Sequence, residues 1–545
     1  MSELSVPPRE ADVTSPRALS AGFAFRASHD REGARLGWFT TPHGVVQTPE
    51  FMPVGTRAAV RGIDMREMRA MGTQMLLANA YHLYLNPGDR MVRALGGLHA
   101  FSRFSGPMLT DSGGYQVFSL AKFRQVREEG VTFKSIVDGS RHNYTPERVM
   151  QIERNLGADV IMQLDELIEG GAEHAASRAA MERSLRWLER CRIEFDRLER
   201  DGREPATSFA VPAGAPAMYG GDAEQERAAP PQALFPIIQG GTSDDLRTAS
   251  INGILQSGDW AGIAMGGLSV GEAKPLMYAT FDTCAPLLPR DKPRYLMGVG
   301  FPDDLIEAVR RGMDLFDCVA PTKMGRHGTV FTEDGKVSIR KSSHRTDRRP
   351  LTDSCPCPAC TDYDRAYLRH LHANEEPLGQ RLLALHNLTF LLQLMDQIRS
   401  AIREERFASW STAWLERARG WVKVMSVDAW LSLVIYTAAT VGFYLLGAAI
   451  LHGQGIVIGD DTGKVIDHLS QSFTNRISYR EIHFSNGQWE NLFWKCSPFF
   501  ASVRLQFAEI EGFEIAHGLS MSLRIKLIYD HRDSNEEDSS RIIFT

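Results

Sequence analysis

The sequence has little cysteine, no strong excess of either charge and no apolar segment at its N-terminus. Only seven cysteines occur in 545 residues, and three of them lie between Cys355 and Cys360. This distribution excludes an evenly spread disulfide framework and favours a metal site in a reducing compartment. The polar residues 1–20 lack the core of a signal peptide and predict a disordered leader on a cytoplasmic protein.

A net charge of −6 excludes a chain that is basic throughout, but it leaves room for a local basic patch. The length exceeds the usual range of one domain, so we expect one large domain with additions. No internal repeat is present beyond an alternation of short apolar runs with longer helical patterns.

The apolar runs begin at Phe51 and number eight. They are FMPVGT (51–56), QMLLANAY (74–81), PMLTDSGG (107–114), DVIMQLDE (159–166), LFPIIQGG (234–241), GIAMGGLS (262–269), RYLMGVG (294–300) and DLFDCVAP (314–321). The clearest helical pattern between them runs from Met181 to Leu198. Strand-like runs that alternate with helices predict a (βα)8 barrel, an α/β fold. Residues 210–232, rich in Ala, Gly and Pro, are predicted to be a surface insertion.

Each run is apolar at its start and polar or glycine-rich at its end. In a (βα)8 barrel the C-terminal ends of the strands form the active-site face. The residues that would converge there are Asn79, Asp111, Asp165, Gln239, Gly266, Gly267, Gly298 and Asp317.

Asp111 and Asp317 are the strongest candidates for chemistry on that face. Asp111 in DSGGYQ, taken alone, is better explained as a residue that caps a helix or orders the glycine turn. With Asp317 as a partner, the two acids form the pair that glycosidic-bond chemistry uses. One attacks the anomeric carbon, and the other handles the proton of the leaving group.

Further polar groups fit a purine-like base. A carboxylate at Asp165 accepts from the N–H donors of a guanine-like ring, and the amide of Gln239 serves its carbonyl side. Backbone groups of Gly267 and Leu268 complete the edge. Tyr115 and Met297 can enclose the ring between them, although each residue alone is as well explained as a packed or turn residue.

A metal site is predicted from Cys355, Cys357 and Cys360, which have C-x-C-x-x-C spacing. Three thiolates and one histidine make a closed tetrahedral zinc site with a structural role. His386 follows in a helical stretch, but His370 and His372 are also near, so the spacing leaves the fourth ligand open.

The segment from Lys323 to Arg349 carries eight basic residues against three acids. It lies between Asp317 and the cysteines. A basic surface beside a base-handling pocket suits a phosphate backbone, whereas the plain alternative is a solvated basic face.

Taken together, DSGGYQVFSL, VIMQLDE, PIIQGG, MGGLSVGE, YLMGVG, DLFDCVAPT and CPCPAC…HN resemble bacterial tRNA-guanine transglycosylases of the queuine tRNA-ribosyltransferase family. The resemblance covers about residues 20–418. It implies a barrel domain over 21–419 with a zinc subdomain at about 322–390, and a homodimer. It also implies exchange of guanine 34 in tRNAs with GUN anticodons for a 7-deazaguanine in queuosine biosynthesis, with zinc and no organic cofactor.

The resemblance also assigns roles to residues. Asp317 would be the nucleophile that forms a covalent tRNA intermediate, and Asp111 the proton acceptor and donor. The other implied sites are base recognition by Asp165, Gln239, Gly267, Leu268 and Glu272, stacking by Tyr115 and Met297, tRNA binding by Lys323 and Arg326, and zinc binding by Cys355, Cys357, Cys360 and His386.

Two positions bear on the choice of base. Leu167 stands where many bacterial members have Cys, so the base preference at that wall of the pocket is left open. Val270 stands where eukaryotic enzymes that accept the bulkier queuine have Gly. We therefore predict 7-aminomethyl-7-deazaguanine as the incoming base, with queuine as the alternative.

Residues 420–545 fall outside the family pattern. Within the hydrophobic segment 420–454, residues 429–451 are 23 residues without a charge, enough to cross a hydrocarbon core of about 30 Å. The segment is a membrane anchor, a buried helix, or unrelated sequence joined by fusion or faulty assembly. The third interpretation is favoured because the reaction needs no membrane. Residues 455–545 carry no motif, but SYREIHFS and SLRIKLIYD alternate like strands before an acidic tail.

Three rival functions use the same residues. A carbohydrate glycosidase would leave Asp165, Gln239 and the zinc site unexplained. A non-catalytic tRNA-binding subunit would be expected to lack one of the two acids. An archaeal-type enzyme would carry an added RNA-binding domain, which the sequence does not reveal.

Overall fold

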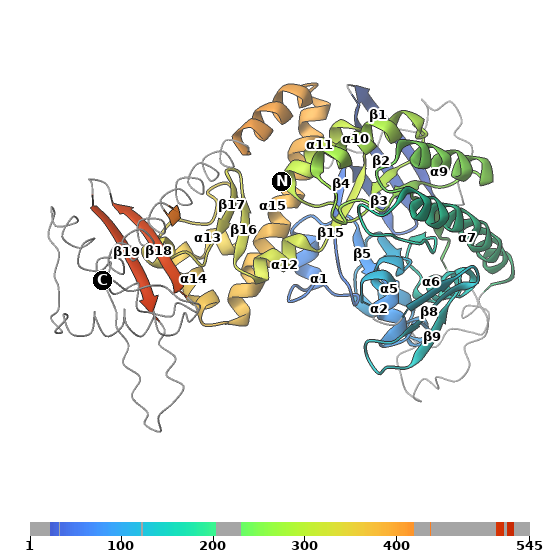
Figure 1. Ribbon diagram of the computed structural model, residues 1–545, viewed down its shortest axis with the longest axis horizontal. Coiled ribbons are helices and arrows are strands. Elements are labelled where there is room, and N and C mark those ends of the chain that lie inside the picture. The colour runs from blue at the N-terminus through green and yellow to red at the C-terminus, as the bar shows by residue number, and fades with distance from the viewer. Residues whose placement is uncertain are drawn as a thin grey trace, which may run out of the picture. The chain divides into compact units, whose positions relative to one another are not determined.

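The computed structural model describes residues 22–31, 33–120, 124–202, 230–418, 436–437, 508–516 and 520–527 (Figure 1). The chain divides into two compact units, Met1–Ala418 and Arg419–Thr545. The predicted leader 1–20, the predicted insertion up to residue 229, and segment 429–451 apart from residues 436–437 lie outside the described residues. Within the described ranges, no helix has the length and apolar character needed to span a membrane.

Parallel strands form the centre of the first unit. They are β4 (Glu50–Pro53), β5 (Leu76–Asn79), β6 (Met108–Asp111), β10 (Val160–Met162), β11 (Ala233–Phe235), β12 (Ile237–Ile238), β13 (Ile263–Met265), β14 (Arg294–Leu296) and β15 (Leu315–Cys318). Each of the eight predicted runs contains a strand. The fifth run is divided into β11 and β12 at Pro236, because proline has no N–H to donate to a neighbouring strand.

The strand pairings follow the order of the chain. One sheet has the order β11-β10-β6-β5, and the other has the order β12-β13-β14-β15-β4. The last strand, β15, pairs with the first, β4, and an isolated bridge joins Val54 after β4 to Leu77 in β5. The pairings therefore return to the strand from which they began. The strand residues are almost all buried, as expected for parallel strands covered on both faces.

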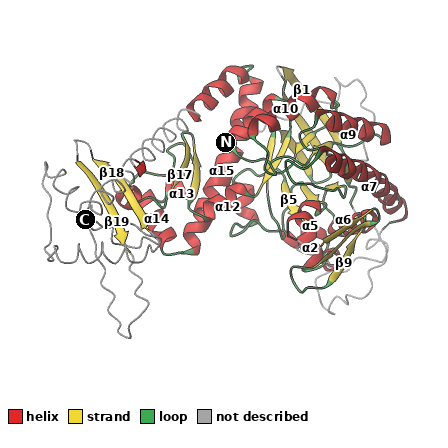
Figure 2. Ribbon diagram, in the orientation of Figure 1, coloured by secondary structure: helices red, strands yellow, loops and turns green. Residues whose placement is uncertain are grey.

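Helices follow the strands and cover them (Figure 2). Those of the first half are α1 (Met65–Ala70), α2 (Ala80–Leu85), α3 (Asp89–Ala94), α4 (Gly97–Ser102), α5 (Gly114–Leu120), α6 (Pro146–Leu156) and α7 (His174–Asp201). Those of the second half are α9 (Asp244–Ser257), α10 (Lys274–Cys284), α11 (Pro302–Arg310) and α12 (Ala320–Arg326). The pattern predicted from Met181 to Leu198 lies in α7, where Met181, Leu188 and Leu198 are buried.

Local sequence sets the ends of α6. Thr145 caps its first turn by accepting a hydrogen bond from Arg148 N at 3.2 Å, and Pro146 occupies the first helical position. Gly157 ends the helix in the left-handed conformation, with φ of 73°. The side of α6 that packs on the sheet buries Val149, Ile152 and Glu153 among others.

Two smaller sheets flank the parallel strands. β1 (Ala24–Arg31), β2 (Ala34–Thr41) and β3 (Gly44–Thr48) precede them, and β7 (Arg124–Arg127), β8 (Gly130–Lys134) and β9 (Arg141–Tyr144) lie between α5 and α6. Both sheets are antiparallel.

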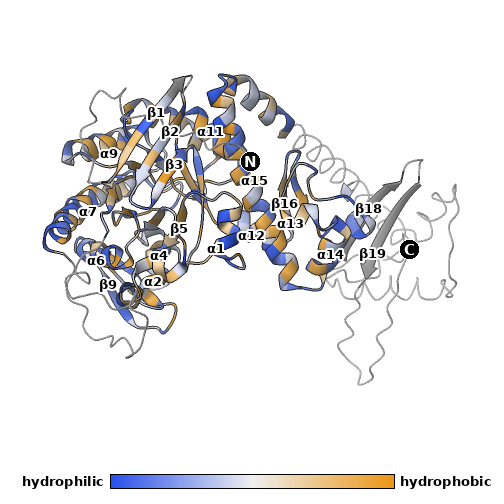
Figure 3. Cartoon of the chain, turned by 180° about the vertical axis from the view of Figure 1, so that it is seen from behind, coloured by the Kyte–Doolittle hydropathy of each residue, from blue (hydrophilic) through white to orange (hydrophobic). Residues whose placement is uncertain are grey.

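A module follows α12. It contains β16 (Thr329–Thr332), β17 (Gly335–Ser338), the 3₁₀ helix η4 (Ser342–Thr346), α13 (Pro358–Thr361), α14 (Arg365–Ala373) and the 27-residue helix α15 (Pro377–Arg403). α12 and α15 pack against each other, and both helices contain many residues coloured as hydrophobic (Figure 3). The middle of α15 is buried from Leu382 to Leu392, so this helix belongs to the core.

The second unit contains β18 (Ala508–Ala516) and β19 (Ser520–Leu527), which pair in antiparallel fashion. The register shifts by one residue between Ile510 and Gly512. The predicted strand SLRIKLIYD coincides with β19 over residues 522–527. The other predicted strand, SYREIHFS, lies outside the described residues.

Candidate active site

Asp111 is the last residue of β6 and lies directly opposite Asn79, the last residue of β5. The amides of Asn79 and Gln116 donate to its Oδ2, the latter at 2.9 Å, and Ala80 N donates to Oδ1 at 3.1 Å. Burial raises the pKa of Asp111 by more than the hydrogen bonds lower it, and the charge of Asp317 adds to the rise, so that the pKa is about 7. No cation among the described residues forms an ion pair with Asp111, so neutral donors alone stabilise its charge.

The glycines after Asp111 allow a close approach to Asp165. Gly113 has φ of 81°, in the left-handed region that favours glycine. A Cβ atom on Gly114 would lie 2.6 Å from Asp165 Oδ1. Tyr115 follows at the start of α5, with 56% of its side chain exposed.

Asp317 lies in β15 and is held through one of its two oxygens. Its Oδ1 accepts from the hydroxyl of Tyr295 at 2.7 Å and from Gly298 N at 2.7 Å. Burial raises the pKa of Asp317, and the two hydrogen bonds lower it. Its Oδ2 has no hydrogen-bond donor in the part of the chain that the structure describes. One carboxylate oxygen is therefore fixed and the other is available.

Asp165 follows β10 and contacts Gln239, which follows β12. Gln239 Nε2 donates to Asp165 Oδ2 at 2.5 Å, and the hydroxyl of Ser112 lies 3.4 Å from Oδ1. Burial raises the pKa of Asp165 to about 6. Gly267 has φ of 64°, and a Cβ atom there would lie 2.4 Å from Gln239 Oε1. These predicted residues therefore lie together.

The two loops that bear on the choice of base touch each other. Leu268 is buried, and Glu272 accepts hydrogen bonds from Ser269 N and, at 3.0 Å, from Val270 N. A Cβ atom on Gly170 would lie 3.1 Å from the carbonyl oxygen of Val270. Met297 also borders this region, because its sulfur lies 3.6 Å from the Cβ position of Gly266.

The predicted cations lie on α12, directly after the strand of Asp317. Lys323 is exposed and Arg326 is half-buried. Burial lowers the pKa of Arg326, and the nearby charge of Arg61 lowers it further. Arg61 is therefore an additional cation that the sequence did not single out. By contrast, Arg348 and Arg349 are tied to aspartates of their own module.

The candidate metal ligands form one buried cluster. The ligand atoms of Cys355, Cys357, Cys360 and His386 all lie within 4.8 Å of one another. His386 Nε2 donates to the carbonyl of Phe331 at 2.8 Å, which leaves Nδ1 facing the thiols of Cys357 at 3.5 Å and Cys360 at 3.3 Å. His370 and His372 take no part. Three thiols and one oriented imidazole fit a tetrahedral ion such as zinc.

A second group of possible metal ligands consists of His43, His99 and Asp159. The two imidazole rings stack with centroids 3.5 Å apart and an interplanar angle of 11°. Parallel rings at this separation cannot both direct a lone pair at one ion. Their nitrogens instead contact the two oxygens of Asp159, at 2.7 Å and 3.2 Å. This group ties three segments together.

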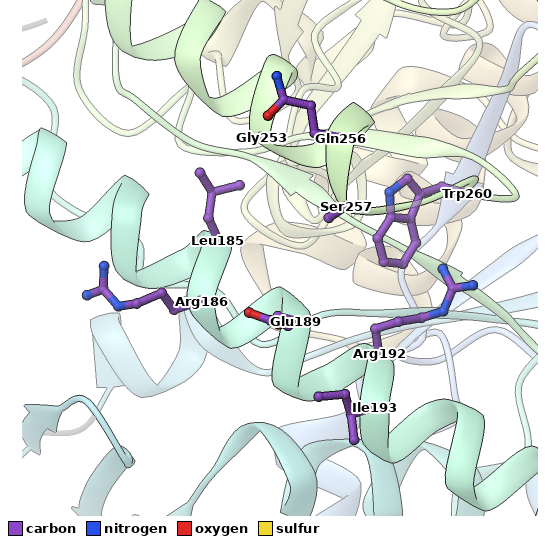
Figure 4. A pocket seen from close by; sticks show the side chains of 9 residues that line it. All are labelled: Leu185, Arg186, Glu189, Arg192, Ile193, Gly253, Gln256, Ser257 and Trp260. Atoms are coloured by element: carbon purple, nitrogen blue, oxygen red, sulfur yellow. The ribbon is translucent and has the colours of Figure 1, made fainter.

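A surface groove lies between α7 and α9 and is bordered by Trp260 (Figure 4). Its lining includes Leu185 and Ile193 from α7, and Arg192 lies over the Trp260 ring at 4.8 Å. None of the predicted site residues lines this groove, so it is separate from the carboxylates at the strand ends.

Known proteins match the part of the chain that carries these groups. A family model described as queuine tRNA-ribosyltransferase matches residues 30–419. The chain belongs to the queuine tRNA-ribosyltransferase family. A relative with that name from Herpetosiphon aurantiacus is 46% identical over 395 residues, covering 72% of this chain and 92% of the relative. Relatives of the same name from Desulforamulus reducens and Pelotomaculum thermopropionicum are 48% identical over 383 residues and 44% identical over 402 residues.

These two matches cover 70% and 74% of this chain, and 95% and 100% of the relatives. The region matched to the queuine tRNA-ribosyltransferase family therefore contains Asp111, Asp317 and the Cys3His cluster. The second unit, Arg419–Thr545, begins where the family match ends.

Proposed function

We propose that this protein is a tRNA-guanine transglycosylase of queuosine biosynthesis. It exchanges guanine 34 in tRNAs with GUN anticodons for 7-aminomethyl-7-deazaguanine. The observation that carries the proposal is the site itself. Among the residues that the structure describes, Asp111 and Asp317 have no cation as partner, and Asp165 and Gln239 form a hydrogen-bonded pair beside them. This set suits cleavage of a glycosidic bond to a guanine-like base.

Asp317 is the nucleophile in this proposal. Tyr295 and Gly298 N hold its Oδ1. Its Oδ2 is the atom that would attack the ribose anomeric carbon. A bond from Oδ2 to that carbon forms as the bond to guanine breaks, and the electron pair stays with the base. The incoming base then displaces Asp317 in a second step, which regenerates the carboxylate.

Asp111 handles the proton in both steps. A pKa raised to about 7 lets it give a proton to the departing base and take one from the incoming base near neutral pH. Its amide partners, Asn79 and Gln116, are neutral and do not lock it in the ionised form. This pKa is the property that distinguishes it from an acid that only caps a turn.

Base recognition falls to Asp165, Gln239 and the peptide at Gly267, with Tyr115 and Met297 enclosing the ring. Glu272 receives the N–H of Ser269, and in a trans peptide the C=O points the opposite way. The carbonyl of Leu268 has no hydrogen-bond donor among the described residues, and in this proposal it accepts from an ammonium group on the base. This supports the aminomethyl base over queuine, as does Val270, and incorporation assays with both bases test the choice.

The tRNA backbone binds across α12. Lys323 and Arg326 have no ion-pair partner in the described ranges, and Arg61 adds to the same positive patch. Charge-removing variants should weaken tRNA binding and make it less dependent on salt.

Zinc occupies the Cys3His cluster as one structural ion per subunit. Elemental analysis of the purified protein tests the assignment, and Cys357→Ser should lose the metal. An equimolar metal other than zinc would contradict it.

A (βα)8 barrel is the architecture that the returning strand pairings support. We propose a homodimer because Tyr363, Tyr367 and His370 form a stacked row, with Tyr367 42% exposed.

The deciding experiment traps the covalent intermediate. Wild-type protein should exchange labelled guanine into tRNA and give a tRNA adduct that survives a denaturing gel. Asp317→Asn should give neither, whereas Asp303→Asn, an exposed acid paired with Lys274, should give both. An adduct with Asp317→Asn would mean that another residue is the nucleophile. Absence of exchange by the wild type would refute the proposed function.

A further inference from the structure

Arg247 on α9 is a buried arginine whose hydrogen bonds within the described ranges all go to backbone carbonyls. Its Nε donates to Gly241 O at 2.7 Å and its Nη1 to Ile238 O at 2.8 Å. Its Nη2 donates to Gly266 O at 2.8 Å and approaches Gly267 O at 3.4 Å. One guanidinium thus joins the end of β12 to the glycine loop that follows β13.

No carboxylate pairs with Arg247 among the residues that the structure describes. Its side chain is 0% exposed, and burial lowers its pKa to about 10, so it stays charged at neutral pH. Cys284 and Glu272 influence its pKa, but neither forms an ion pair with it in the described part of the chain. An unpaired buried charge is costly, and a residue kept for packing alone would not need one.

The peptide between Gly266 and Gly267 places this charge next to the base site. Its C=O points at Arg247, so its N–H points the opposite way. In the described part of the chain, that N–H has no acceptor. Gln239 lies beside it, because a Cβ atom on Gly267 would be 2.4 Å from Gln239 Oε1.

We infer that Arg247 is a positioning residue that polarises the Gly266–Gly267 peptide, so that its N–H stabilises negative charge on the carbonyl oxygen of the purine. Hydrogen bonds in series strengthen one another in a buried site. A charged donor on the C=O therefore makes the N–H a better donor. The inference rests on the proposed function and adds to it a source of electrostatic stabilisation.

The charge arises in the bond-breaking step. When Asp317 bonds to the anomeric carbon, the electron pair of the broken bond to N9 enters the purine ring, and its carbonyl oxygen carries part of the negative charge. Asp111 supplies the proton that neutralises the base. Arg247 keeps all its protons and acts only through the peptide, in the manner of an oxyanion hole.

The test compares Arg247→Lys and Arg247→Gln with the wild type in the full chain. The probes are guanine and 2-aminopurine, which lacks the carbonyl, each measured as an inhibitor of labelled-guanine exchange. We expect the preference for guanine to fall about tenfold in Arg247→Lys and further in Arg247→Gln, because direct loss of one oxyanion donor costs about 100- to 1,000-fold.

Arg294→Lys is the matched control. Arg294 is also buried and donates to the carbonyls of Leu288, Pro289 and Gly312, but at the opposite end of its strand. It should lose stability without a change in the guanine preference. An unchanged preference in folded Arg247 variants, or an equal fall in Arg294→Lys, would overturn the inference. It is also withdrawn if neither Arg247 variant folds, and it falls with the proposed function if wild-type protein exchanges no guanine.

Discussion

Carboxylates lie at both ends of the parallel strands, and their partners differ. At the C-terminal ends, the donors to Asp111 and Asp317 in the described part of the chain are amides, a hydroxyl and backbone N–H groups. At the N-terminal ends, Asp159 contacts two histidines and Asp314 lies 3.5 Å from Arg35. The pKa of Asp111 is raised to about 7, whereas the pKa of Asp159 is lowered to about 2, where its hydrogen bonds outweigh its burial.

This difference indicates which end of the parallel strands carries the reactive carboxylates. A carboxylate whose hydrogen bonds outweigh its burial, such as Asp159, keeps its charge at neutral pH and ties segments together. One held by neutral donors can change its protonation state near neutral pH. The C-terminal end is the end at which barrel enzymes place their chemistry, and the N-terminal end is where they place stability. The variants below test this division.

The largest effect is expected for Asp111→Asn. Exchange of labelled guanine should fall by about 100- to 10,000-fold, the usual contribution of a general acid or base. The melting temperature should stay level or rise, because an amide keeps the shape of the side chain without a buried charge. If Asp111→Asn had a lower melting temperature than the wild type and still exchanged guanine, Asp111 would have a structural role and not a catalytic one.

Asp159→Asn should give the opposite result. Loss of a buried carboxylate that contacts two histidines and accepts from Met108 N is expected to cost about 3 kcal/mol in the free energy of unfolding, measured by urea denaturation. Exchange per folded molecule should change by less than about twofold, because the group lies at the far end of the strands. Asp196→Asn, which breaks an exposed pair with Arg192, should cost no more than about 0.5 kcal/mol and serves as control.

The two ends should also respond to pH with opposite sign. Asp111 has a folded pKa of about 7, above its unfolded value, so its contribution is present below about pH 4 and is lost as pH rises through 7. Asp159 has a folded pKa of about 2, so its contribution is present above about pH 4 and is lost as pH falls toward 2.

Melting curves at pH 5 and pH 8 measure the first of these effects. Relative to wild type, Asp111→Asn should gain about 1–2 kcal/mol between the two pH values, since each pKa unit is about 1.4 kcal/mol and the group is partly accessible. If the stability difference between Asp111→Asn and the wild type were the same at pH 5 and pH 8, the pKa of Asp111 in the wild type would not be raised.

Glu50 gives the smallest expected effect. It lies at the N-terminal end of β4 and pairs with Arg399 at 2.5 Å, yet burial raises its pKa to about 7. Glu50→Gln should therefore cost only about 1 kcal/mol, because half of the wild-type side chains are already neutral at pH 7 and the amide still hydrogen-bonds. A cost near 3 kcal/mol would show that Glu50, like Asp159, is charged at neutral pH and stabilises the fold.

Much of the fold was accessible from the sequence. All eight predicted runs contain a strand. A buried parallel strand is apolar throughout, so it can be identified in the sequence without knowing which strand pairs with it. Asp111, Asp165 and Asp317 were singled out because each breaks such a run with an acid. The cysteine spacing identified three members of the Cys3His cluster.

The contributors that were missed depend on contacts across the chain. Tyr295 lies inside a predicted run, and nothing local reveals that its hydroxyl meets Asp317. Ser112 and Arg247 resemble ordinary turn and helix residues until the strand ends are brought together. His386 could be chosen over His370 and His372 only through the family resemblance, since Phe331, which orients it, lies 55 residues away.

The contact between Glu50 and Arg399 also constrains the timing of synthesis, because 349 residues separate the two. At about 5–20 residues per second, a ribosome needs roughly 20–70 s to deliver the arginine after the glutamate. For most of that interval β4 lacks β15, and for all of it β4 lacks the cation on α15. The nascent chain therefore holds its first parallel strand unfinished until almost all of the first unit has been made, and chaperones have that long to cover it.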